Sequence, residues 1–172
     1  MPTAQVGGST KRSRSRTGAR ASANASKKAD AIKLLKEDHR EVKTWFKQYE
    51  QLENRAEKQA LARKICAALT VHATIEEEIF YPALRQNIED DLLDEAEVEH
   101  ASAKQLIAEI LSMSPKEQLF DAKVKVLGEY VMHHVEEEEH EIFPEARESD
   151  VDLGDLGEKL SKRKAELMKK AA

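Results

Sequence analysis

The stretch LTVHATIEEEIFYP at residues 69–82 decides the fold, because it places a histidine where a soluble helix normally buries a leucine. Its apolar residues recur every three to four positions, which is typical of a helix with one buried face. His72 lies on that face, and Glu76 lies on the same face about 6 Å further along the axis. A buried glutamate without a partner charge is costly. The segment therefore predicts a helix whose inner face holds a cation.

A second stretch, VMHHVEEEEHEIFP at residues 131–144, repeats this pattern. In both stretches a proline lies ten positions after the inward histidine, at Pro82 and Pro144. Each HxxxE is also preceded by a further histidine on an apolar face, with 33 residues between His39 and His72 and 34 between His100 and His134. The repeat predicts two similar helical hairpins related by a pseudo-twofold axis.

The apolar period from Asp30 onward predicts four long helices and a short fifth one. Their expected ranges are about 30–53, 57–86, 89–112, 115–146 and 155–170. Short connections make successive helices antiparallel neighbours, so the expected fold class is all-α, an up-down-up-down four-helix bundle with a short C-terminal helix.

Several residues set the expected helix ends. Asp30 can cap the first helix, and Pro82 is expected to end or kink the second. Ser114 and Pro115 supply a cap and a first-turn proline for the fourth. The third and fourth helices are expected to turn several leucines inward, including Leu111 and Leu119.

The charge distribution divides the chain into a basic tail and an acidic body. Residues 1–29 contain seven Lys or Arg and no acidic residue, which leaves 21 basic and 33 acidic residues in the remainder. A body this acidic repels nucleic acid, so any contact with nucleic acid is expected to use the tail. The expected organisation is a disordered basic tail at 1–29, the bundle at 30–147, and a linker with the short C-terminal helix at 148–172.

Composition excludes several function classes. A single cysteine, Cys66, forms neither an internal disulfide nor a cysteine-rich zinc site. The sequence has no 18-residue apolar run, so we expect a cytoplasmic protein without a membrane partner. It also has no evident nucleophile–base pair and no glycine-rich phosphate loop.

One inward histidine falls on each of the four long helices, and together with two inward glutamates they predict a two-metal site. The candidate metal ligands are His39, His72, Glu76, His100, His134 and Glu138. Mixed imidazole and carboxylate ligands suit two iron ions, with manganese or zinc as less favoured alternatives.

Some assignments near this site stay open. His134 is preferred to His133 because it continues the apolar stripe, and His140 is expected on the outer face. Glu97, one helical turn before His100, is an alternative ligand. Tyr81 is either a hydrogen-bond partner of the site or, as favoured here, a tyrosine at the edge of the core.

The pattern H…HxxxE…H…HxxxE over residues 30–147 resembles the hemerythrin-like, or HHE cation-binding, domains. The resemblance implies that the four histidines are terminal ligands of two irons and that Glu76 and Glu138 bridge them beside an oxo or hydroxo group. Oxygen-carrying hemerythrins have a fifth histidine where this chain has Lys104, and their last carboxylate corresponds to Glu139. The site is therefore more similar to the broader bacterial HHE group.

This resemblance implies a non-haem diiron protein that binds, senses or buffers dioxygen, another reactive small molecule, or iron. Its partner would be a diatomic molecule or a peroxide. The alternative is a diiron enzyme that acts on peroxide, nitric oxide or ferrous iron at the same site. A third reading is a bundle with structural zinc or no metal.

Overall fold

The computed structural model describes residues 30–171, and over this range the chain forms five helical rods and no strand. The predicted disordered tail lies outside the described residues. The rods are α1 (Ala31–Gln51); α2 (Arg55–Ile75), continued by η1 (Glu76–Phe80) and α3 (Tyr81–Leu84); α4 (Asp90–Ser112); α5 (Phe120–Glu137), continued by η2 (Glu138–Ile142) and α6 (Phe143–Glu148); and α7 (Leu153–Ala171).

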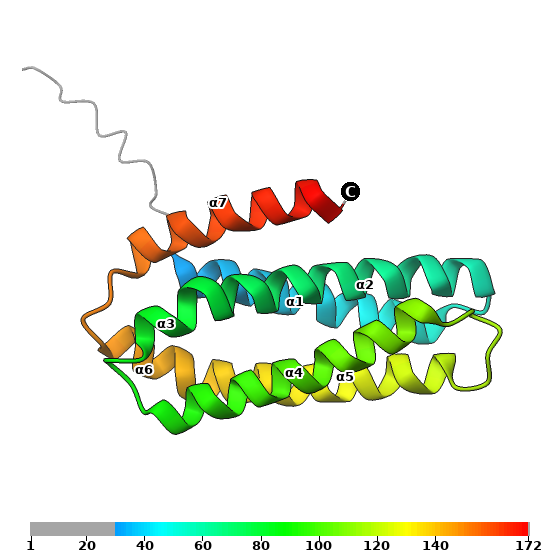
Figure 1. The fold of residues 1–172 in the computed structure, drawn as a ribbon, viewed down its shortest axis with the longest axis horizontal. Coiled ribbons are helices and arrows are strands. Elements are labelled where there is room, and N and C mark those ends of the chain that lie inside the picture. Colours follow the sequence, from blue (N-terminus) through cyan, green and yellow to red (C-terminus); the bar gives the residue numbers. More distant parts are fainter. Residues whose placement is uncertain (1–29, 172) are drawn as a thin grey trace, which may run out of the picture.

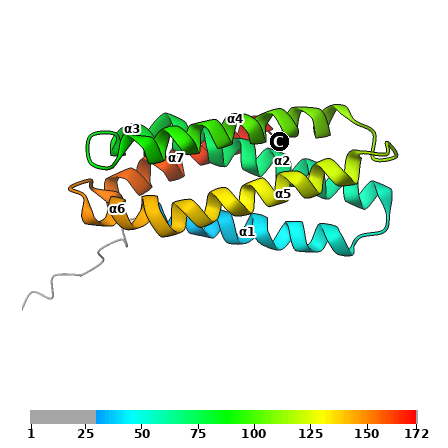
Figure 2. The ribbon, with the colours of Figure 1, turned by 90° about the horizontal axis from the view of Figure 1, so that it is seen from below.

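The first four rods form the predicted antiparallel bundle (Figures 1 and 2). Around the bundle α1 packs on α2, α2 on α4, α4 on α5, and α5 on α1. The all-α prediction and the four-helix bundle are therefore confirmed.

The N-terminal caps explain where the first two rods begin. The Asp30 side chain accepts a hydrogen bond from the backbone N–H of Lys33, as predicted. Asn54 caps α2 in the same way through the N–H groups of Ala56 and Glu57. Each cap satisfies donors that the first helical turn leaves without a partner.

The predicted start of the fourth helix was wrong. The Glu117 side chain does accept a hydrogen bond from the N–H of Ser114, but this contact lies within a turn and the helix begins at Phe120. Leu119 therefore precedes the helix and is 57% exposed, and Leu111 at the end of α4 is 44% exposed. Both leucines were expected in the core, and both lie at the end of the bundle where few neighbours cover them.

Each HxxxE segment contains a π-helical turn that begins at its glutamate. The N–H of Tyr81 bonds to the carbonyl of Glu76, and the N–H of Phe143 bonds to the carbonyl of Glu138. A π-helical turn inserts one extra residue and rotates the rest of the helix by about 100°. The prolines that follow do not end their helices, because each lies in the first turn after the π turn.

Two apolar clusters fill the bundle above and below the level of the four histidines. One cluster contains Leu35, Phe80 and Phe143 with Leu156 and Leu160 of α7. The members of the other cluster are Val42, Tyr49, Ala62, Ile65, Cys66, Leu69, Ile107, Ile110, Phe120, Val124, Leu127, Val131 and Val135. The histidines are thus held between two close-packed regions.

Helix α7 packs along α1 and α2, so the basic C-terminal segment joins the folded unit (Figure 1). The guanidinium of Arg163 pairs with Glu78, and the ammonium of Lys164 pairs with Asp38. Among the described helices, none combines the length and apolar character needed to cross a bilayer.

Replacing Phe80 with alanine is expected to lower the free energy of unfolding by about 3–5 kcal/mol. Phe80 is fully buried, and its ring centroid lies 5.8 Å from that of Phe143 in an edge-to-face arrangement. Urea denaturation followed by circular dichroism measures the change. The control Leu119→Ala is expected to change stability by less than about 0.5 kcal/mol because its side chain is exposed. Equal losses from the two substitutions would contradict this packing.

Candidate metal centre

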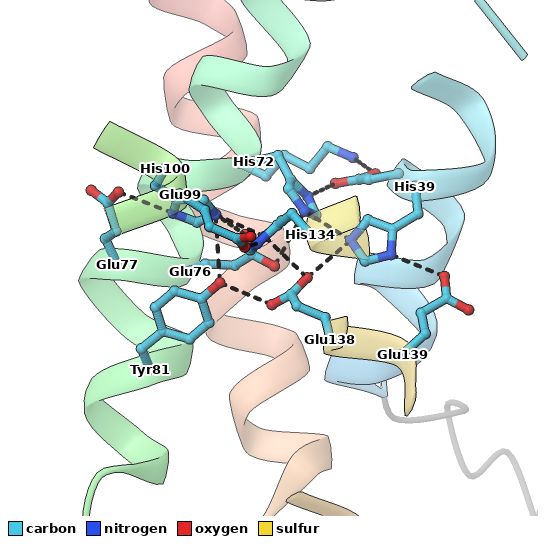
Figure 3. Close-up of polar contacts among 12 residues, drawn as sticks. His39, His72, Glu76, Glu77, Tyr81, Glu99, His100, His134, Glu138 and Glu139 are labelled. Carbon is cyan, nitrogen blue, oxygen red and sulfur yellow. Dashed lines mark hydrogen bonds and ion pairs between the residues drawn. The ribbon is translucent and has the colours of Figure 1, made fainter. Parts of the chain in front are cut away.

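Four imidazole rings point their Nε2 atoms toward the bundle axis (Figure 3). The Nε2 atoms of His39 and His72 are 3.0 Å apart, and those of His100 and His134 are also 3.0 Å apart. All four side chains are buried. The structure thus brings together the four histidines that the sequence analysis placed on separate helices.

Two glutamates complete the cluster, and both are 0% exposed. Glu76 reaches both pairs, with Oε1 lying 3.2 Å from Nε2 of His72 and Oε2 lying 3.4 Å from Nε2 of His100. Oε2 of Glu138 lies 3.2 Å from Nε2 of His39 and 3.6 Å from that of His134. All six predicted site residues therefore converge, and each glutamate lies between the two histidine pairs.

The Nδ1 atoms point outward, and each faces a carboxylate. The pairs are His39 with Glu139 at 3.0 Å, His72 with Asp38 at 3.3 Å, His100 with Glu77 at 3.0 Å, and His134 with Glu99 at 2.8 Å. A carboxylate accepts hydrogen bonds, so Nδ1 carries the proton and the Nε2 of a neutral ring presents a lone pair inward. Such outer carboxylates are the usual partners of histidines that bind metals.

The inner donors fit a pair of cations. Both oxygens of Glu76 and Oε2 of Glu138 are buried without a hydrogen-bond partner. The lone pairs of facing Nε2 atoms also repel unless a proton or a metal ion lies between them. Two groups of candidate donors result: His39, His72, Glu76 and Glu138 form one, and Glu76, His100 and His134 form the other.

The charges around His72 and Glu76 favour a positive charge between them. Burial disfavours a charged imidazole, yet Glu76 and Asp38 raise the pKa of His72 to about 10. Burial also disfavours the Glu76 carboxylate, but His72 and His100 hold its pKa well below the usual range. The cluster therefore requires positive charge between its donors, and a metal would displace protons on binding.

The two halves of the centre differ at the aromatic residue that follows each HxxxE motif. Tyr81 donates a hydrogen bond of 2.9 Å from its hydroxyl to Oε1 of Glu138, and its ring stacks on His100. Phe143 takes the equivalent place in the second half, stacks on His39, and has no hydroxyl. Burial and the charge of Glu138 raise the pKa of Tyr81, so the hydroxyl stays a donor. Tyr81 therefore contacts the centre; of the two positions considered from the sequence, a hydrogen bond to the site and the favoured place at the core edge, the structure shows the hydrogen bond.

The residues whose assignment the sequence left open lie at different distances from the inner donors. His133 is 65% exposed, and His140 is exposed and bonds to the backbone of its own helix. The carboxylate of Glu97 pairs with Arg85 and lies away from the inner donors. Glu139 contacts the outer nitrogen of His39, while Glu138 reaches the inner ones.

The outer carboxylates Asp38, Glu77 and Glu99 were missed in the sequence analysis. Each lies next to an inward residue in the chain, and this adjacency is the only signal that the sequence offers. Long runs of glutamate conceal the signal, because most members of such a run are solvated. Glu77 lies in such a run, yet it is half-buried against His100.

A small apolar pocket of about 40 Å³ opens beside the histidines. Its apolar walls include Val42, Leu69, Ile107, Val131 and Val135. This space suits a molecule of two or three atoms and is too small for an organic substrate.

Comparison with known proteins agrees with this geometry. The family model described as the hemerythrin HHE cation-binding domain matches residues 30–146. A crystal structure of a hemerythrin HHE cation-binding domain-containing protein from Mycobacterium kansasii superimposes with a TM-score of 0.71 and 26% identity, covering 82% of this chain and 88% of that chain.

One curated relative is described as a DNA nickase from Nostoc sp. (strain PCC 7120 / SAG 25.82 / UTEX 2576). It is 31% identical over 114 residues, which make up 66% of this chain. The chain spans about a third of that relative's length, 32%.

Proposed function

Because the chain belongs to the hemerythrin HHE cation-binding family, we propose that its buried donors hold two iron ions and that this non-haem diiron centre binds, senses or buffers dioxygen, a related reactive small molecule, or iron itself. The observation that carries the proposal is the convergence of four Nε2 atoms on two fully buried glutamates without a lysine or arginine between them in the described residues. Imidazole and carboxylate donors together suit iron among the common metals.

The residues have distinct roles in this proposal. His39 and His72 hold one ion and His100 and His134 the other, while Glu76 and Glu138 lie between them. The outer carboxylates keep each imidazole in the tautomer that offers Nε2 to the metal. Iron held by these residues would supply open coordination positions at which a small molecule binds.

The apolar pocket favours a diatomic molecule or a peroxide as the ligand. Its walls limit the ligand by size and keep bulk water from the inner donors. The hydroxyl of Tyr81 holds one oxygen of Glu138 and so fixes the orientation of that carboxylate.

Metal analysis with an optical spectrum tests the proposal. We expect about two irons per chain and an absorption near the ultraviolet edge that changes on exposure to peroxide or nitric oxide. Metal-replete protein that lacks iron would reject the proposal. A steady-state assay separates a binding protein, which reacts once per centre, from an enzyme, which turns over.

Replacing Asp38 with alanine is expected to lower metal affinity about 10- to 100-fold. Asp38 is the partner of Nδ1 of His72, and without it the ring loses its orientation and basicity. Equilibrium dialysis with ferrous iron measures the change. The exposed neighbour Glu37 makes a matched control, since Glu37→Ala is expected to leave affinity unchanged. Equal effects at the two positions would contradict the role of Asp38.

A further inference from the structure

A second HxxxE lies one residue before the one that points into the centre. His133 and Glu137 are four residues apart on α5, and Nε2 of His133 lies 3.2 Å from Oε1 of Glu137. They stand beside His134 and Glu138 but face α4 at the surface. The carboxylate of Glu99 lies between the two motifs, with Oε2 on Nδ1 of His134 and Oε1 3.8 Å from Nε2 of His133.

Three of the four outer carboxylates are each neutralised by a lysine. The ammonium groups of Lys164, Lys104 and Lys36 pair with Asp38, Glu77 and Glu139, respectively. In each case the carboxylate contacts a histidine of the centre and a cation on its outer side.

Glu99 departs from this pattern. Among the described residues no lysine or arginine pairs with Glu99, and none pairs with Glu137 either. Where the other outer carboxylates meet an ammonium group, Glu99 meets an imidazole and a second carboxylate. The three donor atoms of Glu99, His133 and Glu137 lie within 4.8 Å of one another. A divalent cation between them would neutralise both carboxylates, which a single protonated histidine does not.

A small polar cavity of about 30 Å³ runs inward from this cluster. Its lining includes Glu99 and Glu137 near the surface and, at its inner end, His134 and Glu138. Glu138 is 0% exposed and its Oε2 has no hydrogen-bond partner. Carboxylates of the surface cluster and of the buried centre therefore line one cavity.

We propose that Glu99, His133 and Glu137 form a third cation site, at the surface, which binds a divalent first-row metal such as Zn²⁺. One imidazole and two carboxylates suit these metals, and water completes the coordination. Because Glu99 also holds His134, the outer ion and the buried centre share one carboxylate. The site thus lies directly outside the buried centre.

Calorimetric titration of the iron-replete full chain with Zn²⁺ tests this site. The unmodified protein is expected to take up one further equivalent of Zn²⁺. His133→Ala and Glu137→Gln are expected to weaken this binding by about tenfold or more, since each removes a ligand. The matched controls His140→Ala and Glu136→Gln change exposed residues on the same helical rod and are expected to leave it unchanged.

Iron content measured before and after the titration shows whether Zn²⁺ has entered the buried centre. Absence of the further equivalent, or its persistence in both His133→Ala and Glu137→Gln, overturns the proposal. A protein that holds no iron but still binds Zn²⁺ through His133 would reject the diiron proposal and support this site.

Discussion

His134→Ala is expected to remove iron from the protein, whereas His133→Ala leaves the iron content unchanged. The two histidines are adjacent in the chain but differ completely in environment. His134 is buried, and its Nε2 lies 3.0 Å from that of His100. His133 is 65% exposed. Without His134, one metal position keeps its two histidines and the other keeps only His100. Iron content should therefore fall from about two per chain to one or less.

Iron analysis by mass spectrometry measures this effect, and circular dichroism establishes that both variants keep the helical fold. The comparison is stringent because the two substitutions remove the same chemical group one residue apart. Equal iron content in the two variants would show that the inner nitrogen cluster does not hold the metal.

Removing the metal is expected to lower the melting temperature by about 5–11 °C. A ligand at a hundred times its dissociation constant stabilises the folded state by about 2.7 kcal/mol, and each kcal/mol shifts the melting temperature of a chain this long by about 2–4 °C. The effect is large because the metal replaces the protons that otherwise balance two buried carboxylates. Calorimetric melting of the protein before and after chelation measures it, and restoring iron serves as the control.

The sign of the pH dependence follows from the raised pKa of His72. In the metal-free protein this group stabilises the fold fully below its unfolded pKa of about 6.5, and the contribution is lost as pH rises through about 10. Metal binding must displace this proton, so the gain in melting temperature on adding iron should be larger at pH 8.5 than at pH 6. A gain that shrinks as pH rises would contradict this account.

The sequence predicted the bundle because its signals are local and periodic. The apolar stripe determines which face of each helix is buried. The histidines that interrupt this stripe, such as His39 and His72, can be recognised from the sequence alone. The same reasoning predicted that the six candidate donors lie at the same height along the bundle. In the structure they lie together. Their binding of metal remains a prediction.

Other features depend on tertiary contacts that a single helical period does not encode. The π turns shift the buried face by one residue, and Pro82 and Pro144 are their only sequence signals. The fourth helix begins after its predicted capping residues. The hydrogen bond from the N–H of Ser114 to the Glu117 side chain forms equally well within a turn, so it does not require a helix there. The packing of α7 rests on pairings such as that of Arg163 with Glu78, 85 residues away in sequence.

The tyrosine hydroxyl on one side of the centre makes the two metal positions chemically inequivalent. Oε1 of Glu138 is engaged by Tyr81, and the donors divide into a group of four and a group of three. Under the proposed function, the two positions would fill one after the other, and the first ion would occupy the position with four donors. If the centre binds two metals as proposed, two different metals would occupy its positions in a preferred order rather than at random.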